Sequence, residues 1–307
     1  QPDNVWRIDL QLGRDADPEI EKQPERVIPR LKAMLGSNVD FDLEWVSVYS
    51  FQCRRLARFR HGRVFFLGDS AHQVSPFGAR GGNGGVQDAD NLCWKLAAAL
   101  AGRAGDALLD SYDRERIPAA DENILHSTRS TDFISPQNAA TRSFRDAALE
   151  LAEHHPFARA LVNSGRLSRA YAPPGNGDSL LGSGSPCPDA PLQQGNQRSW
   201  LLHELRGDFC GLYFADSRPA AVESEKLSRL KADCPGLRPL VIGGQDCRAT
   251  DFWQDCDDLF AARYGATPGS FTLVRPDQHV VAQWPRLDSA AVAQAHAACL
   301  ARGSINI

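Results

Sequence analysis

Residues 63–96 read RVFFLGDSAHQVSPFGARGGNGGVQDADNLCWKL, and this stretch decides the expected fold of the first half of the chain. The apolar run Arg63–Leu67 is typical of a buried parallel strand, and it ends abruptly at a Gly-Asp pair. A glycine-rich loop follows over Ser75–Gly85, and a helix is predicted from near Gly84 to Leu100. This order predicts an open α/β sheet with Asp69 at the carboxyl end of a strand, where such sheets bind ligands.

The residue types in this segment favour a flat ligand that carries hydroxyl groups and an electron-rich or anionic edge. The Asp69 carboxylate can accept hydrogen bonds from sugar or polyol hydroxyls. Glycines lack a Cβ atom, so the loop backbone can approach a planar ring closely. The free N–H groups and positive dipole end of the following helix favour negative charge. The glycines in question are Gly78, Gly81, Gly82, Gly84 and Gly85.

Each of these features also has a plainer interpretation when it is taken alone. Asp69 can be a turn residue at a strand end, and the glycines can form a flexible loop. Gly-Asp-Ser resembles the nucleophile motif of some esterases, but the Asp-x-x-His element which that chemistry needs late in the chain is not evident. His72 is expected to be a packed or hydrogen-bonded structural histidine.

Taken together, the elements form a specific pattern. Gly-Asp-Ser-Ala-His is followed by Pro-Phe-Gly, then Gly-Gly-Asn-Gly-Gly, then Asp-x-x-Asn-Leu-x-Trp-Lys-Leu. This pattern closely resembles the second FAD-binding motif of the single-component, group A FAD-dependent aromatic hydroxylases. That family includes phenol hydroxylase, 4-hydroxybenzoate hydroxylase and 3-(3-hydroxyphenyl)propionate hydroxylase.

The resemblance implies an FAD site and a reaction. Asp69 would bind the ribityl chain, Pro76 would lie near the flavin ring where oxygen reacts, and the glycine-rich backbone would lie against the pyrimidine side. NAD(P)H would reduce FAD, and a flavin C4a-hydroperoxide would hydroxylate a phenolic ring. No catalytic base and no metal site are assigned. The implied cofactor-binding residues are Gly68, Asp69, Pro76, Gly81, Gly82, Asn83 and Gly84.

The chain divides into four stretches, and its expected fold class is α/β. Residues 1–52 are interpreted as a remnant of the substrate-domain sheet, and residues 53–171 as the C-terminal part of the FAD-binding domain with a helical segment. Residues 172–194 are dense in Pro, Gly and Ser, as linkers are. Residues 195–307 resemble the thioredoxin-like C-terminal domain of the phenol hydroxylase branch.

In the first two stretches, Val5–Leu12 and Phe41–Cys53 are predicted strands. Trp6 and Trp45 could line a phenol pocket, although a core position is the expected one for both. Further site candidates on a predicted helix are Arg129, Asp132 and His126, and a solvated helix face explains them equally well. Helices are predicted over Pro18–Leu35 (ended by Gly36), Ala107–Arg116, Ala119–Ser130 (separated from the previous helix by Pro118), Ala139–Ala152 and Pro156–Val162.

The last stretch is predicted to follow a βαβαββα order. A redox thioredoxin needs two cysteines two residues apart after its first strand, but residues 213–219 read YFADSRP. Thiol–disulfide chemistry is therefore not expected, and a packing role or a homodimer contact is. The predicted elements are strand Gly211–Ala215, helix Glu223–Ala232, strand Leu237–Ile242, helix Phe252–Tyr264, strands Phe271–Arg275 and Val280–Trp284, and helix Ser289–Arg302.

Composition narrows the class of protein further. The net charge is −4 and no long basic run occurs, so nucleic acid is not an expected partner. No apolar stretch approaches the length of a membrane span, and no signal peptide precedes the first strand-like run. The eight cysteines form no CxxC pair and no zinc-type spacing. A cytoplasmic protein with reduced thiols is therefore expected.

One departure from the family pattern is large. The sequence contains no GxGxxG motif, which in the family binds the FAD pyrophosphate, and no middle Asp-Gly motif. The chain is accordingly interpreted as a piece of a larger hydroxylase whose N-terminal segment is supplied by a longer parent. Two alternatives stay open: a non-catalytic fragment with a structural or interaction role, and a flavin-dependent epoxidase or Baeyer–Villiger-type oxygenase.

Overall fold

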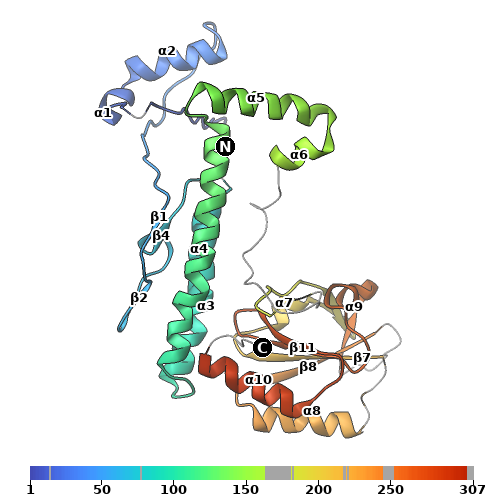
Figure 1. The fold of residues 1–307 in the computed structure, drawn as a ribbon. Helices are drawn as coiled ribbons and strands as arrows, with labels where there is room; N and C mark the ends of the chain where they lie inside the picture. Colours follow the sequence, from blue (N-terminus) through green and yellow to red (C-terminus); the bar gives the residue numbers. More distant parts are fainter. Residues whose placement is uncertain are drawn as a thin grey trace. The chain divides into compact units, whose positions relative to one another are not determined.

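The computed structural model of the chain forms two compact units, Gln1–Phe51 and Gln52–Ile307, and each is described by itself (Figure 1). The described residues are 1–13, 15–76, 78–162, 181, 183–216, 219, 221–244 and 252–302. Residues 172–180 and 182 of the predicted linker lie outside them.

Two helices form the regular structure of the first unit, α1 (Pro18–Glu21) and α2 (Pro24–Leu35). The single helix predicted here is interrupted because Pro24 forces the residue before it out of the helical region, and Gln23 accordingly has ψ 141°. Gly36 ends α2 as predicted, with φ +106°.

The strands predicted over Val5–Leu12 and Phe41–Cys53 are wrong, since neither segment forms a ladder in the structure. A strand exists only where a neighbour supplies hydrogen bonds, and none of the described segments pairs with these two. The expected core positions of Trp6 and Trp45 are also wrong: their exposed fractions are 87% and 74%. Among the residues described in this unit, only Leu31 is buried.

The second unit opens with short antiparallel ladders. The buried parallel strand predicted over Arg63–Leu67 is wrong, because only Val64–Phe65 is a strand and its partner runs antiparallel. Val64 is 55% exposed, since no parallel neighbour covers it. The chain then enters a 3₁₀ turn, η1 (Gly68–Ser70). The paired strands are β1 (Arg54–Arg55) with β4 (His72–Gln73), and β2 (Arg60–His61) with β3 (Val64–Phe65).

Two long helices, α3 (Arg80–Leu100) and α4 (Asp106–Ile134), pack against each other (Figure 1). Helix α3 begins earlier than predicted, so most of the predicted glycine-rich loop forms its first turns. The break predicted at Pro118 is also wrong, because α4 continues through it. Pro118 lies on the exposed face of the helix, where water can replace the hydrogen bond that proline cannot donate.

Arginines of the short strands β1 and β2 pair with carboxylates of α4. Arg55 Nε lies 2.6 Å from Asp121 Oδ1, and Arg60 Nη1 lies 2.7 Å from Asp110 Oδ1. A small apolar cluster formed by Phe59, Ala71, Leu92, Tyr112 and Ala120 lies between the short strands and the two helices. The two helices after α4, α5 (Ala139–His154) and α6 (Pro156–Val162), agree with the prediction.

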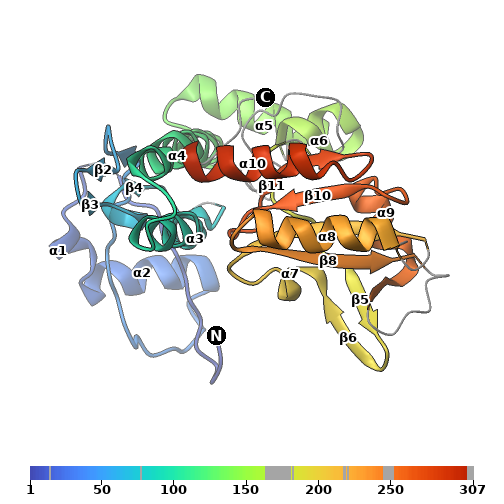
Figure 2. The same ribbon diagram turned by 90° about the horizontal axis from the view of Figure 1, so that it is seen from below.

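The C-terminal part is a seven-stranded sheet in the order β11-β10-β7-β8-β9-β5-β6 (Figure 2). Strands β7 and β8 are parallel. Strand β10 runs antiparallel to β7, and β11 runs antiparallel to β10. The strands are β5 (Pro191–Gln194), β6 (Gln197–Trp200), β7 (Phe209–Ala215), β8 (Leu237–Gly243), β9 (Trp253–Asp255), β10 (Phe271–Val274) and β11 (Val280–Trp284). The helices are α7 (Leu201–Glu204), α8 (Ala221–Asp233), α9 (Leu259–Tyr264) and α10 (Ser289–Arg302).

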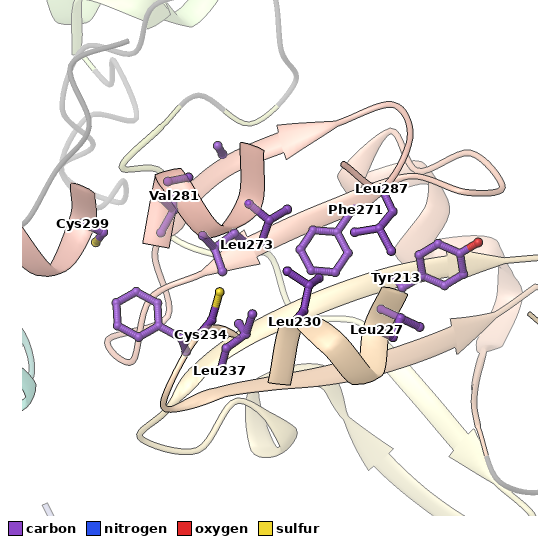
Figure 3. Close-up of a cluster of buried hydrophobic side chains, with 14 of the residues drawn as sticks. Tyr213, Leu227, Leu230, Cys234, Leu237, Phe271, Leu273, Val281, Leu287 and Cys299 are labelled. Carbon is purple, nitrogen blue, oxygen red and sulfur yellow. The ribbon is translucent and has the colours of Figure 1, made fainter. Parts of the chain in front are cut away.

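The alternation of β7 builds a core on each face of this sheet. Phe209 and Tyr213 pack with α8 and α10, and Figure 3 shows the labelled side chains of that cluster. Leu212 and Phe214 pack on the opposite face with α9. Gly211 lies on the first face. A Cβ there would lie 2.3 Å from Phe271 Cζ, so the packing of Phe271 requires glycine at this position.

The predicted βαβαββα order is present as β7-α8-β8-α9-β10-β11-α10, and the α/β fold class is confirmed. The helix predicted over Phe252–Tyr264 is only partly correct, because β9 pairs with β8 and β5 before α9 begins. Strand β5 occupies the end of the stretch interpreted as a linker, and Ala190 and Leu192 are buried there. The sheet domain therefore includes these residues.

Seven cysteines lie in the described part of the chain, and none of these seven is in a disulfide. Cys247 lies outside it. Among the helices that the structure describes, none is long and apolar enough to cross a membrane.

Candidate functional site

The turn at Gly68 lies directly against helix α3. Gly68 has φ +57°, a left-handed conformation that glycine adopts without strain. A Cβ built on Gly85 would lie 3.2 Å from the Gly68 Cα, so the two backbones are in contact. This contact brings the exposed carboxylate-bearing residue Asp69 beside the first turns of α3.

A buried carboxylate, Asp88, fixes this turn from below. Its Oδ2 accepts the Gly68 N–H at 3.0 Å and lies 2.7 Å from His72 Nε2, while its Oδ1 accepts Arg116 Nε at 2.6 Å. Burial would raise the pKa of Asp88, but the hydrogen bond from His72 and the Arg116 charge outweigh it and lower that pKa. His72 is therefore a buried, hydrogen-bonded histidine, as the sequence predicts.

Hydroxyl groups fix the loop that contains Pro76. Ser75 Oγ lies 2.6 Å from Ser127 Oγ and 2.9 Å from Thr131 Oγ1, both on α4. Ser127 also donates to the Ser75 carbonyl at 3.1 Å. Pro76 is exposed at the end of this anchored segment. A Cβ on Gly81 would lie 3.6 Å from Val74 Cγ2, so the loop runs beside the start of α3.

Helix α3 begins without a side-chain cap. Its N-cap residue, Ala79, has φ +51° and ψ 37°, an unfavourable left-handed conformation for a residue with a Cβ. The first turn contains no acidic residue. Asn83 Nδ2 donates to the Ala79 carbonyl at 2.8 Å, so this side chain does not cap the first N–H groups of the helix.

The glycines of this first part of α3 fall into two groups. Gly82 is exposed, and a Cβ there would meet nothing within 4 Å. Gly84 is buried, and a Cβ there would lie 3.2 Å from His72 Cε1. The exposed Gly82 presents backbone without a side chain to a ligand. Gly84 and Gly85 instead allow α3 to pack closely on His72 and Gly68. The structure thus brings together Gly68, Asp69 and Gly81 to Asn83, with Gly84 below the surface.

The three further candidates on α4 lie along its C-terminal half. Arg129 and Asp132 are exposed, which agrees with a solvated helix face. His126 is half-buried, with Nε2 3.9 Å from Glu122 Oε1. Nothing in their geometry assigns them a catalytic role.

Sequence reasoning gave no role to the residues that hold the site in place. Asp88 was visible as the first residue of the Asp-x-x-Asn motif, but its partner Arg116 lies in a separate helix. Ser127 and Thr131 carried no local signal, because only the packing of α4 brings them to Ser75.

Residues 1–127 match the family described as an FAD binding domain. The 6-methylpretetramide 4-monooxygenase of Streptomyces rimosus is 32% identical over 295 residues, which cover 89% of this chain and 51% of that protein. The 4-methyl-5-nitrocatechol 5-monooxygenase of a Burkholderia species is 30% identical over 284 residues, which cover 90% of this chain and 49% of that protein.

A solved structure has the same fold. The flavin-dependent monooxygenase PieE, determined in complex with FAD and substrate, superposes with a TM-score of 0.73 at 24% identity. The match covers 94% of this chain and 56% of that one. The chain spans about half the length of the curated relatives it matches.

Proposed function

We propose that this chain carries one half of the FAD site of a flavoprotein monooxygenase that hydroxylates a phenolic or other aromatic substrate. The observation that carries the proposal is the packing of the Gly68 turn against the uncapped, glycine-lined amino end of α3. That arrangement sets a carboxylate, Asp69, near the amino end of α3, whose first backbone N–H groups have no acceptor within the helix. Flavins have the matching pair of groups, a hydroxylated ribityl chain and an electron-rich pyrimidine edge.

Each residue has a stated role in this proposal. Asp69 would accept hydrogen bonds from the ribityl hydroxyls. The backbone N–H groups of Gly81, Gly82 and Asn83 would face the pyrimidine edge, where the helix dipole stabilises negative charge. Pro76, on its anchored loop, would border the ring at the side where oxygen and substrate enter.

The residues present fit the cofactor. The surface of Gly82 is open, so a planar ring can lie against the backbone there. Helix α3 has 21 residues and carries no acidic residue in its first turn, so its dipole is not already compensated. The left-handed Ala79 is the kind of strained residue found where a backbone is shaped around a ligand.

The proposed reaction converts a phenol, O₂, NAD(P)H and a proton to a dihydroxylated ring, NAD(P)⁺ and water. Bound FAD would supply the redox chemistry, taking electrons from NAD(P)H and activating oxygen. The names of the two relatives support an aromatic ring as the substrate. The protein's part is to orient the flavin and to exclude water around it.

The test is FAD binding by the 307-residue chain. FAD is added in excess, unbound flavin is removed by gel filtration, and the flavin absorption band of the protein peak is recorded. We expect a retained band in the native chain and a roughly 10-fold weaker affinity in Asp69→Ala, which loses a charged hydrogen-bond acceptor. Asp233→Ala, an exposed aspartate of α8, is the control and should leave affinity unchanged. A colourless native protein at saturating FAD would contradict the proposal.

A further inference from the structure

A buried ionic cluster joins the β10–β11 hairpin of the C-terminal sheet to helix α4. Arg275, only 5% exposed, donates from Nη1 to Glu115 Oε1 at 3.0 Å and from Nη2 to Glu115 Oε2 at 2.8 Å. Arg275 Nε also donates to Asp277 Oδ1 at 2.8 Å. A two-bond contact of this kind fixes the orientation of both side chains, because the planar guanidinium matches the carboxylate.

The same cluster reaches helix α3. Asn91 Nδ2 donates to Glu115 Oε2 at 2.7 Å and to Asp277 Oδ2 at 3.1 Å. Lys95 Nζ donates to Asn91 Oδ1 at 2.8 Å and lies 3.2 Å from Glu115 Oε2. The sheet domain therefore contacts α3 directly through Asp277 and indirectly through Glu115.

Apolar packing surrounds these charges. The guanidinium carbon of Arg275 lies 5.4 Å from the centre of the Trp94 ring, which also meets Phe209 edge-on at 5.7 Å. Trp94 and Ala98 of α3 and Leu108 of α4 belong to the same buried cluster as the core of the sheet domain. Two cations and two carboxylates balance one another, so the cluster has no net charge when all four are ionised.

This ionic cluster adjoins the polar contacts beneath the proposed flavin site. Glu115 and Arg116 are consecutive in α4, and they contact Arg275 and Asp88 respectively. On α3, Asp88, Asn91 and Lys95 are spaced by three and four residues and so lie on one helix face. Two sets of contacts, one at the Gly68 turn and one at the hairpin of the C-terminal sheet, thus lie next to each other along α3 and α4.

We propose that Arg275 and Asp277 are positioning residues for the proposed flavin site. They fix the rotation and depth of α3 through Asn91, Lys95 and Glu115. The C-terminal domain thereby holds in place the helix whose amino end faces the flavin. No CxxC pair of cysteines occurs in this domain. The flavin part of this inference rests on the proposed function, whereas the effect on α3 does not.

Buried ion pairs add little to stability compared with apolar packing, but they strongly favour one geometry. If Arg275 and Asp277 fix the position of α3, replacing Arg275 should change the amide hydrogen exchange of α3 beyond the residues that contact the cluster. Residues 84–88 lie about one to three turns away from Asn91 and Lys95, toward the amino end of the helix. Their amide hydrogen exchange is the readout that a purely local contact would not change.

The experiment compares hydrogen exchange in the native 307-residue chain, Arg275→Gln and the control Arg229→Gln, without added FAD. Arg229 lies on α8 of the same domain and is 71% exposed in its pair with Glu225. We expect exchange over residues 84–88 to be roughly 10-fold faster in Arg275→Gln and unchanged in the control. Faster exchange confined to residues 91–95 and 271–284 would overturn the proposal.

Two further measurements keep the result interpretable. Arg275→Lys retains the charge without the two-bond geometry, and we expect it to give the same direction of change with a smaller size. FAD affinity should fall at least about 5-fold in Arg275→Gln that is still folded by circular dichroism. Unchanged affinity in the folded variant would overturn the flavin part. If the native chain takes up no FAD, the proposed function fails. Hydrogen exchange then still tests whether Arg275 fixes the position of α3.

Discussion

The backbone N–H of Gly68 donates to the carboxylate of Asp88 at 3.0 Å, across 20 positions of sequence. This bond ties the turn that carries Asp69 to the third turn of α3, just after the glycines. The same carboxylate binds Arg116, so one buried group holds a turn and two helices together. Removing its charge should therefore affect both stability and any ligand at the amino end of α3.

Asp88→Asn should destabilise the protein by about 3 kcal/mol, because it leaves Arg116 buried beside a neutral amide. Urea denaturation followed by circular dichroism measures the free energy of unfolding. Asp233→Asn, at an exposed position in α8, is the matched control and should change it by less than about 0.5 kcal/mol. An equal, small effect in both variants would show that the Asp88 cluster does not support the fold.

Gly85→Ala and Gly82→Ala should act in opposite directions, although both place alanine in the same helix. At residue 85 the new Cβ would lie 3.2 Å from the Gly68 Cα, whose backbone Asp88 holds in place. We expect a loss of about 1–3 kcal/mol there. At residue 82 nothing lies within 4 Å, so alanine should stabilise α3 by up to about 1 kcal/mol.

The same pair separates stability from binding. Gly82→Ala should weaken FAD affinity despite its greater stability, because the methyl group would occupy the surface proposed for the flavin ring. Thermal unfolding and FAD titration of the two variants give the two quantities. A Gly82→Ala chain that is more stable and binds FAD as tightly as the native chain would argue against flavin contact at this residue.

Acid should weaken the protein through Glu115. Although burial acts to raise it, the charges of Arg275 and Lys95 hold the pKa of Glu115 at about 2, below its ordinary 4.5. A carboxylate with a depressed folded-state pKa stabilises above its unfolded pKa. Its contribution, about 3 kcal/mol, should therefore be lost as the pH falls from about 4.5 to about 2.

Urea denaturation at several pH values between 5 and roughly 2.5 measures this dependence. Glu115→Gln should be less stable than the native chain at pH 5 and should show a shallower pH slope below about pH 4.5. Parallel curves for the two proteins would mean that other carboxylates account for the acid sensitivity.

Ser127→Ala should loosen the loop that carries Pro76. It removes the 2.6 Å bond to Ser75 Oγ and the 3.1 Å bond to the Ser75 carbonyl. The expected cost is about 1–2 kcal/mol, since both bonds are buried. Hydrogen exchange over residues 74–79 should rise in the variant, and exchange in the sheet domain should stay as in the native chain. A uniform rise over the whole chain would instead indicate general destabilisation.

Local patterns were sufficient for the elements that carry their own signal. Helix α10 and strands β7 and β8 were predicted closely, because alternation or helical spacing marks them without reference to the rest of the chain. The short strands β5, β6 and β9 were missed. Each depends on a partner distant in the sequence, as when Leu192 pairs with Asp255.

The low helix propensities of proline and glycine led to wrong predictions at two places where tertiary packing determines the structure. Proline predicted a break in α4, but Pro118 lies on the exposed face, and the buried Tyr112 and Ala119 hold the helix on either side. Glycines predicted a loop up to residue 85, although glycine is a poor helix former mainly when nothing compensates its backbone entropy. Here the contact between Gly68 and Gly85 supplies that compensation.

The sequence alone predicted the class of the site, because Gly68-Asp69 and the glycines that follow are a contiguous motif whose chemistry can be interpreted residue by residue. It also predicted the order of β7, α8, β8, α9, β10, β11 and α10, although not the strands β5, β6 and β9. Only the tertiary structure decided what holds the site, because Asp88, Arg116, Glu115 and Arg275 are brought together from three separate elements. Which buried charges pair with one another depends on how the elements pack, and the spacing of residues along the chain does not predict it.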